Sequence, residues 1–173
     1  LNPTDSAGVE AAVNAAKADW NGFAVLHNAA GRVGGLDVGF VPGEGGKAVA
    51  GMLGETDLLF LLGADEIDMA KTGGAFVVYI GTHGDAGAHR ANVILPGAAY
   101  TEKSGTYVNT ECRVQQTNRA GFAQVDARDD WAILSALSDV LGTKLRFDSL
   151  PQLRARLYDE YPQPARICHD SAA

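Results

Sequence analysis

Two uninterrupted apolar runs constrain the fold of this chain more than any other feature. They are LLFLL at residues 58–62 and AFVVYIG at residues 75–81, and each is bounded by polar or turn-forming residues. Neither run alternates apolar with polar residues, so both faces of each segment must be covered. Strands covered on both faces are typical of parallel sheets with helices on either side, and the runs therefore predict an α/β fold.

The neighbouring segments extend this pattern into a strand–helix alternation. The sequence predicts two further short strands and a set of short helices; the strands are 23–28 and 92–96, and the helices are 47–53, 65–71 and 85–91. This alternation predicts a partial doubly wound, Rossmann-like parallel sheet with helices on both faces. Because such sheets often have five or six strands, we expect the missing strands to lie upstream of Leu1, in a longer chain of which this is a fragment.

Helices are also predicted at both ends of the chain. A helix over 8–20 has Asp5 or Ser6 as its cap and Gly22 as its stop, and two amphipathic helices follow at 127–142 and 149–161. In the first of these two, one side is apolar, and Gly142 ends the helix; the apolar residues are Trp131, Leu134, Leu137, Val140 and Leu141. In the second, Ser149 is the cap and Pro151 lies in the first turn. We assign 1–162 to one domain and 163–173 to a flexible tail.

A loop of some twenty residues interrupts this regular pattern between 96 and 117. Long loops inside compact domains usually either serve a function or are disordered. In open α/β sheets, ligands bind beyond the carboxyl ends of the strands. The loops 63–68, 81–89 and 96–103 are therefore predicted to share one rim, where any pocket should lie.

Composition excludes several kinds of partner. The formal charge is −7, from 14 basic and 21 acidic residues, and the basic residues are scattered along the chain. Nucleic acid and anionic membranes both require a concentrated positive surface, so we expect no nucleic-acid partner. No apolar run approaches the roughly eighteen residues needed to span a bilayer, so we expect no direct membrane insertion. The chain begins at Leu1 without a basic-then-apolar leader, so no signal peptide is expected.

The two cysteines, Cys112 and Cys168, lie far apart in the sequence, as expected in a reducing compartment. Iron–sulfur clusters normally need four protein ligands, commonly four thiolates or two thiolates with two imidazoles. Two cysteines without a CxxC pattern do not supply such a set. We therefore expect no cluster in this segment.

Two other candidate sites are better interpreted as structural. His83, Asp85 and His89 could bind a metal, but the two histidines lie six residues apart instead of four, and a turn with Asp85 capping a short helix is the better interpretation. The segment 42–48, PGEGGKA, resembles a phosphate loop but has Val41 and Ala48 where the P-loop pattern requires Gly and Ser or Thr. A glycine-rich surface loop is expected there.

The available catalytic groups form no recognisable set. The carboxylates Glu102, Glu111 and Asp129 have no pairing at a known spacing, and Cys112 has only Arg113 beside it to lower a thiol pKa. The sequence therefore predicts no catalytic, cofactor-binding or metal-binding residue in this segment. From the residues alone, the chain is an α/β ligand-binding domain.

Three strings in the chain match one family in order: GADEID at 63–68, HGDAGAHRANVILPGAAYTEKSGTYVNTECRVQQT at 83–117, and ARDDWAILSALSDVLG at 127–142. From about residue 20 to 161 the chain resembles the C-terminal half of the large peripheral-arm subunit of respiratory complex I. That family comprises the large iron–sulfur subunit of bacterial NADH-quinone oxidoreductase and the mitochondrial 75 kDa subunit. It belongs to the wider molybdopterin oxidoreductase family, whose pattern is matched at 91–96, 102–109 and 111–115, with Asn92 in place of a frequent Asp and Cys112 in place of a usual Gly.

The resemblance implies a non-catalytic structural domain that supports electron transfer from NADH to quinone. It implies 4Fe-4S and 2Fe-2S clusters in N-terminal parts absent from this segment, other peripheral-arm subunits as partners, and a location on the cytoplasmic face of a bacterial inner membrane or the matrix side of the mitochondrial one. In catalytic relatives the rim loops hold a pterin guanine dinucleotide with molybdenum or tungsten, whereas Cys112 favours a domain that has lost this cofactor.

Two alternatives stay open: a working molybdopterin-dependent oxidoreductase related to formate dehydrogenase, and a free-standing small-ligand module, which an unpaired sheet edge argues against. In the structural reading the long loop is ordered. The turn begins at Ala98–Tyr100, Glu102 and Lys103 are solvated, and 106–109 is extended, with Tyr107 and Val108 packing the loop onto the domain.

Overall fold

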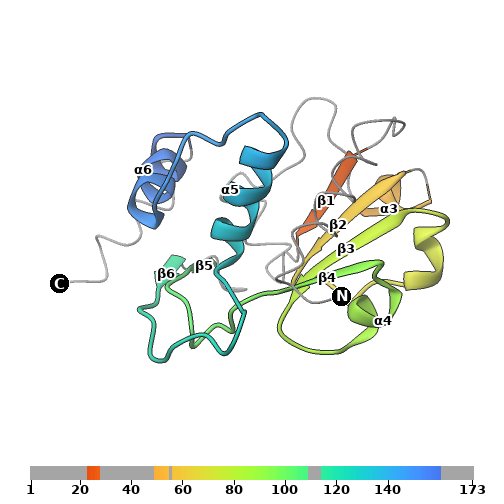
Figure 1. The fold of residues 1–173 in the computed structure, drawn as a ribbon, viewed down its shortest axis with the longest axis horizontal. Helices are drawn as coiled ribbons and strands as arrows, with labels where there is room; N and C mark the ends of the chain where they lie inside the picture. Colours follow the sequence, from red (N-terminus) through yellow and green to blue (C-terminus); the bar gives the residue numbers. More distant parts are fainter. Residues whose placement is uncertain (1–22, 28–48, 55, 109–113, 161–173) are drawn as a thin grey trace.

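The four apolar segments form one parallel sheet in the computed structural model. Its strands are β1 (Phe23–His27), β2 (Leu58–Leu62), β3 (Phe76–Gly81) and β4 (Val93–Pro96), and their order in the sheet is β1-β2-β3-β4 (Figure 1). The register pairs Leu59 with Val77 and Tyr79 with Ile94. This confirms the predicted α/β fold and all four predicted strands.

The structure describes residues 23–27, 49–54, 56–108 and 114–160, and of 23–27 it describes the backbone. The predicted N-terminal helix over 8–20, the glycine-rich loop at 42–48 and the tail at 163–173 lie outside these ranges. Within the described ranges, no helix has the length and apolar character needed to cross a bilayer.

Short helices cover one face of the sheet, and a long helix covers the other. On the first face lie α3 (Val49–Met52), the 3-10 helix η1 (Met69–Thr72) and α4 (Ala86–Arg90), and on the second lies α5 (Asp130–Val140). The first face buries Leu59, Leu61, Val77 and Tyr79 under these short helices. On the second face, Phe60, Val78 and Ile80 pack against Ile133, Leu134 and Leu137 of α5.

The predicted placement of helices on both faces is therefore confirmed. Each of the four strands lies beside its neighbour in sequence, so the strand order does not reverse among β1–β4. The reversal point that often marks the ligand site of a doubly wound sheet is thus not found between these strands.

Two predicted helices need correction, one in its extent and one in its apolar side. The segment predicted as a helix over 65–71 becomes helical only at Met69, because the Asp68 side chain accepts a hydrogen bond from the Ala70 amide at 3.2 Å and starts the 3-10 turn there. Helix α5 ends near Gly142, as predicted, and this glycine has a φ of 74°. Val140, predicted on the apolar side of α5, is 45 % exposed, so that assignment is wrong.

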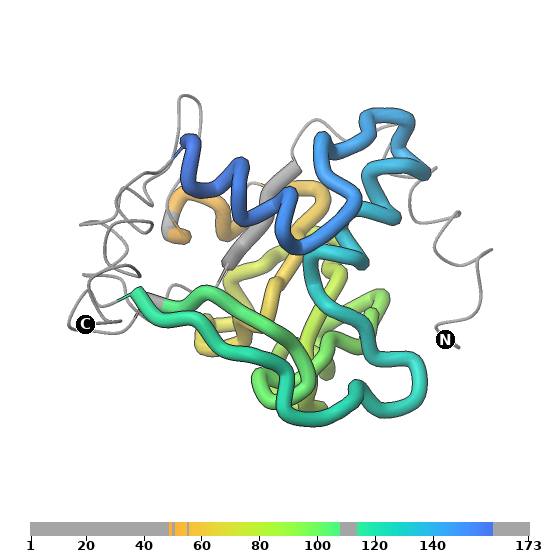
Figure 2. Tube along the Cα trace, turned by 90° about the vertical axis from the view of Figure 1, so that its left-hand side faces the viewer, coloured from red at the N-terminus to blue at the C-terminus, as the bar shows by residue number. Residues whose placement is uncertain are grey.

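A two-stranded antiparallel hairpin, β5 (Thr106–Val108) with β6 (Val114–Gln116), stands apart from the main sheet. In Figure 2 its two arms, green and teal, run side by side. The predicted extended conformation after Gly105 is confirmed, but the pairing with 114–116 was not predicted. Helix α6 (Leu150–Glu160) lies against the hairpin, and the Gln116 side-chain amide donates a hydrogen bond to the Tyr158 hydroxyl.

Candidate functional site

Three loops meet at the carboxyl edge of the parallel sheet, as the sequence predicts. The Gly63 amide donates to the Ile80 carbonyl at 2.7 Å, and the Gly97 amide donates to the Gly81 carbonyl at 3.0 Å. These bonds place the starts of loops 63–68, 81–89 and 96–103 side by side. Any ligand of this sheet would be expected at this rim.

The Tyr79 side chain lies at the rim, on the face of the sheet that α4 covers. The side chain is 4 % exposed, and its ring covers Gly81, two residues further along β3, and Gly87 in α4. A Cβ atom at Gly87 would lie 2.8 Å from the Tyr79 ring, and one at Gly81 would lie closer still. The two glycines therefore leave a hollow that the chain fills with its own tyrosine. Burial raises the pKa of the Tyr79 phenol, and the nearby Asp65 and Asp85 carboxylates raise it further.

The electrostatics of this part of the rim are negative. The loop 63–68 contains three acidic side chains and no Lys or Arg, and the loop 81–89 adds Asp85, again without Lys or Arg. The nearest basic residues along the chain serve other contacts. Lys71 lies 3.8 Å from Asp68, and the Arg90 guanidinium donates to the carbonyls of Gly73 and Ala75 and to the Thr72 hydroxyl.

The histidine-containing loop shows no metal-binding arrangement. His83 Nδ1 lies 2.7 Å from the Thr82 hydroxyl, and Asp85 occupies the N-cap position of α4. The capping position is as predicted, but the Asp85 side chain makes no capping hydrogen bond, so that part of the prediction is wrong. No three His, Cys, Asp or Glu side chains within the described ranges are grouped so as to hold a metal ion.

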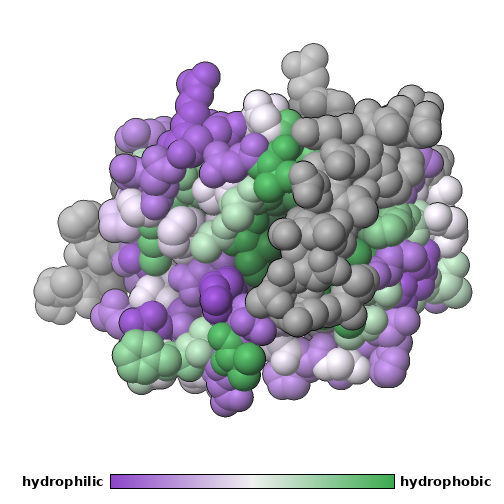
Figure 3. Space-filling view, in the orientation of Figure 1, coloured by the Kyte–Doolittle hydropathy of each residue, from purple (hydrophilic) through white to green (hydrophobic). Residues whose placement is uncertain are grey.

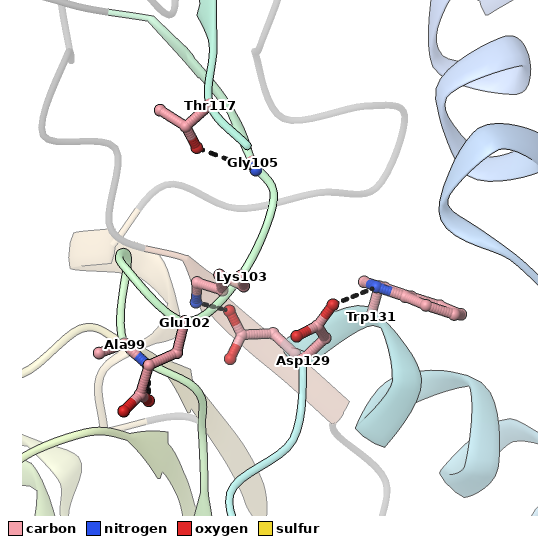
Figure 4. A network of polar contacts seen from close by, with 8 residues as sticks. Ala99, Glu102, Lys103, Gly105, Thr117, Asp129 and Trp131 are labelled. Atoms are coloured by element: carbon pink, nitrogen blue, oxygen red, sulfur yellow. Dashed lines mark hydrogen bonds and ion pairs between the residues drawn. The ribbon is translucent and has the colours of Figure 1, made fainter. Parts of the chain in front are cut away.

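The third loop, 96–103, uses its polar side chains to hold its own conformation (Figure 4). The Ala99 amide donates to a Glu102 carboxylate oxygen at 2.9 Å, and the Glu102 amide donates back to the Ala99 carbonyl at 2.9 Å. This confirms the predicted turn. The Lys103 ammonium forms an ion pair with Asp130 at the start of α5, and the Lys103 side chain is only 22 % exposed. The prediction that Lys103 is solvated is therefore wrong.

The chain that returns from the hairpin reinforces this connection. The Ala98 amide donates to the Arg128 carbonyl at 2.8 Å, and the Arg128 amide donates to the Pro96 carbonyl at 3.1 Å. Next to them the Trp131 indole donates to Asp129 at 3.1 Å. Asp129, a candidate catalytic carboxylate by sequence, thus orients a tryptophan. Backbone bonds thus join loop 96–103 to the segment that leads into α5, and the ion pair between Lys103 and Asp130 joins it to α5 itself.

The predicted packing of the hairpin needs correction. Tyr107 is 39 % exposed, and its ring lies over Gly105 instead of the domain core. Among the hairpin side chains that the structure describes, Val114 is buried, at 2 % exposure, and the side chain of Val108 lies outside that description. Glu111, Cys112 and Arg113 lie outside the described residues, as does Cys168. The sequence reasoning also missed Tyr79 and Asp130, although the Tyr-x-Gly spacing at the end of β3 was a usable signal for the former.

Comparison with known proteins identifies the family. The model of the molybdopterin oxidoreductase family matches residues 7–140, which is more than half of the chain. The chain belongs to the molybdopterin oxidoreductase family. The fold agrees, because an α/β sheet with ordered rim loops underlies the matched region.

Relatives within this family are complex I proteins. The chain is 45 % identical over 150 residues to the NADH-ubiquinone oxidoreductase 75 kDa subunit of Reclinomonas americana, covering 86 % of this chain and 22 % of that protein. It is 48 % identical over 145 residues to the mitochondrial 78 kDa subunit of Neurospora crassa, covering 83 % and 19 %. It is 44 % identical over 154 residues to a subunit of the NADH-quinone oxidoreductase of Rickettsia bellii, covering 89 % and 22 %. The chain thus spans about a fifth of the length of these relatives.

The family implies a phosphorylated pterin cofactor, and the described rim fits such a group poorly. The hollow left by Gly81 and Gly87 is filled by Tyr79. The carboxylates of Asp65 and Asp85 beside it would repel a diphosphate. Lys103, the basic residue of the third loop, is already paired with Asp130. No chemical step through this cofactor follows from the described residues.

Proposed function

We propose that this chain is a non-catalytic structural domain of the large iron–sulfur subunit of NADH:quinone oxidoreductase, complex I. In this role it supports electron transfer from NADH to quinone by stabilising the subunit, and it passes no electrons itself. The relatives in Reclinomonas, Neurospora and Rickettsia are named as subunits of such an enzyme, which supports this assignment.

One observation supports the non-catalytic part of the proposal above all. The two charged side chains of the loop 96–103 are bonded within the chain: Glu102 closes its own turn, and Lys103 is paired with Asp130. Tyr79 adds to this, because its ring fills the space between two glycines at the rim. Groups bonded in this way stabilise the loop and are not available to a ligand without breaking those bonds.

The proposal includes the surroundings of the domain. We infer that its partners are other peripheral-arm subunits of complex I, and that the 4Fe-4S and 2Fe-2S clusters lie in other parts of the full-length subunit. We place the domain on the cytoplasmic face of a bacterial inner membrane or on the matrix side of the mitochondrial inner membrane. We assign no catalytic, cofactor-binding or metal-binding residue to this segment.

The test is the molybdenum, tungsten and extractable pterin content of the full-length subunit, purified within its native complex and measured per polypeptide. A molybdopterin enzyme purified from the same cells is the matched control, because it shows that the cofactor is being made. We expect less than about a tenth of an equivalent of each in the subunit. Near-stoichiometric metal and pterin would overturn the proposal and favour the alternative, a working formate dehydrogenase-like cofactor domain, which the family match keeps in view.

A further inference from the structure

A loop surface on the side of β4 away from the other strands exposes large apolar side chains. Phe122 is 81 % exposed and Val125 is 90 % exposed, and the two are only three residues apart. Tyr100, at 74 %, adjoins them, because the Ala120 and Gly121 amides both donate to the Thr101 carbonyl. Figure 3 shows hydrophobic side chains projecting at the lower edge of the molecule, where Figure 1 draws this loop in teal. Single exposed apolar residues are ordinary, but several that adjoin one another are a feature of interaction sites.

This loop is held in one conformation. Besides the two bonds to Thr101, the Arg119 amide donates to the Ser104 hydroxyl at 3.1 Å, and the Ala127 amide donates to the Gln124 carbonyl at 2.9 Å. Val125 has a φ of 47°, which a β-branched residue rarely adopts. Such a conformation persists only when the surroundings impose it. The apolar side chains are therefore presented outward by a fixed backbone.

Two arginines flank the apolar side chains. The Arg119 guanidinium lies 4.7 Å from the centre of the Phe122 ring, a cation–π contact that fixes the orientation of the ring. The Arg128 guanidinium donates to the carbonyls of Val125 and Ala127. Within the described part of the chain, neither guanidinium forms an ion pair with a carboxylate, and both residues are exposed. The surface therefore has positive charge to offer in a chain whose formal charge is −7, although Asp126 offsets part of it.

We propose that this surface docks the domain onto another protein subunit, at an apolar pocket with carboxylates on its edge. We call it the Phe122 surface and define it by Tyr100, Arg119, Phe122, Val125 and Arg128. Aromatic and Arg side chains are enriched at the centres of protein interfaces, and a rigid loop reduces the entropy lost on binding. The inference rests on the proposed function, since the relatives are named as subunits of one enzyme.

The test is a competition for incorporation into the native complex. Cells express the full-length wild-type subunit together with a tagged Phe122→Ser, Val125→Ser variant, and mass spectrometry gives the ratio of the two in the purified complex and in the total soluble pool. We expect the ratio in the complex, relative to the pool, to fall at least tenfold. Normalising to the pool removes any difference in folding or turnover. The matched control is Val49→Ser, which makes the same Val-to-Ser change at a residue that is 40 % exposed on α3, outside the Phe122 surface. It should incorporate within twofold of wild type.

Charge and contact are tested separately. Arg119→Glu should reduce incorporation at least tenfold, whereas Arg119→Lys should stay within twofold, because it keeps the positive charge that the partner's carboxylates require. A benzophenone amino acid at position 122 should crosslink to a different subunit, at a site with Asp or Glu nearby. The same photo-probe at position 49 is the control and should not yield that product.

The outcomes separate this inference from the proposed function. Absence of the wild-type subunit from the complex would overturn both. Suppose instead that the wild-type subunit incorporates normally and that the Phe122→Ser, Val125→Ser variant incorporates within twofold of the Val49→Ser control. That result would overturn the docking surface alone. A crosslink only to a second copy, to lipid, or to another part of the same polypeptide would likewise overturn it.

Discussion

At the scale of single residues, Asn92, which directly precedes β4, is bonded to β3 through both its amide and its side chain. Its amide donates to the Val77 carbonyl at 2.8 Å, and its side-chain oxygen accepts from the Val77 amide, also at 2.8 Å. Arg90 adds a longer bond to the same oxygen at 3.4 Å. An Asp at this position would offer an oxygen at the same place. The departure from the family pattern therefore preserves the acceptor.

Two substitutions at Asn92 show whether the protein needs the hydrogen-bond acceptor of this side chain or its lack of charge. Asn92→Ala leaves the buried Val77 amide without its partner, which costs about 1–3 kcal/mol and should lower the melting temperature by roughly 2–4 °C per kcal/mol. Asn92→Asp keeps the acceptor and should melt within about 2 °C of wild type. Thermal unfolding followed by circular dichroism measures both. Equal losses in the two variants would contradict this account of the side-chain oxygen.

Tyr79 gives the protein a pH dependence of stability at the alkaline end. Its pKa in the folded state is raised above the ordinary value of about 10 by burial and by Asp65 and Asp85. The unfolded chain therefore loses this proton first as the pH rises. The stability contributed by the protonated phenol is complete below pH 10 and is lost as the pH rises through the folded-state pKa. Tyr79→Phe should make the fall in melting temperature between pH 9 and 11 shallower than it is in the wild type.

At the scale of elements, the long loop is stabilised by the side chains that its family motif supplies. The ion pair between Lys103 and Asp130 is half-buried, with exposures of 22 % and 39 %, and it connects the loop to the first turn of α5. A second ion pair, Lys144 with Asp148, is mostly exposed, at 56 % and 67 %. Exposed pairs contribute little to stability, so the two pairs form a natural comparison.

We expect Lys103→Met to weaken the loop more than Lys144→Met weakens the protein. The first should raise amide hydrogen exchange at Ala98 and in β5 by a few-fold and cost about 1 kcal/mol, whereas the second should leave the melting temperature unchanged within measurement error. A double variant of Lys103→Met with Asp130→Asn should be no worse than the two single changes added. Equal losses of stability in the Lys103→Met and Lys144→Met variants would contradict the view that the half-buried ion pair holds the loop to α5.

The hairpin is anchored by Val114, not by Tyr107. Val114→Ala removes two methyl groups from a site that is 2 % exposed and should cost about 2 kcal/mol. Tyr107→Ala removes a side chain that is 39 % exposed and lies over Gly105, so its cost should be about half as large. Melting temperatures of the two variants decide the order. A larger loss at Tyr107 would restore the sequence-based expectation that this tyrosine packs the loop onto the domain.

The strands of the main sheet could be predicted from the sequence, whereas the pairing in the hairpin could not. Continuous apolar runs such as 58–62 predict a buried strand from local sequence alone. A run of five apolar residues between polar ones is too short for a buried helix but has the usual length of a strand. The three-residue strands 106–108 and 114–116 lack such a run, and their pairing depends on contacts between distant residues. The ion pair of Lys103 joins residues 27 apart, and the burial of Tyr79 depends on two glycines on different elements. Neither has a periodic signal in the sequence.

At the scale of the whole molecule, stability should be distributed unevenly. Strand β3 pairs on both sides and is buried on both faces, with Val77 and Ile80 fully covered. Helix α6 has no fully buried residue. Regions with many buried apolar contacts open only with global unfolding, whereas sparsely buried ones open locally.

Native-state hydrogen exchange should reproduce this distribution. Amides of β2 and β3 should exchange slowest, and those of α6 should exchange at least about a hundredfold faster, which corresponds to a difference of about 2.7 kcal/mol in opening free energy. Control measurements at two pH values verify that exchange reports equilibrium opening. Equal protection of α6 and β3 would mean that the terminal helix unfolds together with the sheet.

The strand order of the main sheet has a consequence for synthesis of the protein on the ribosome. Each strand from β1 to β4 is added beside the strand made just before it, so the sheet can grow as the nascent chain emerges. Its second face must wait for α5, which begins some thirty residues after β4 ends. Until then α5 does not cover Phe60, Val78 and Ile80. We expect this interval of translation to be the one in which a chaperone binds the growing chain.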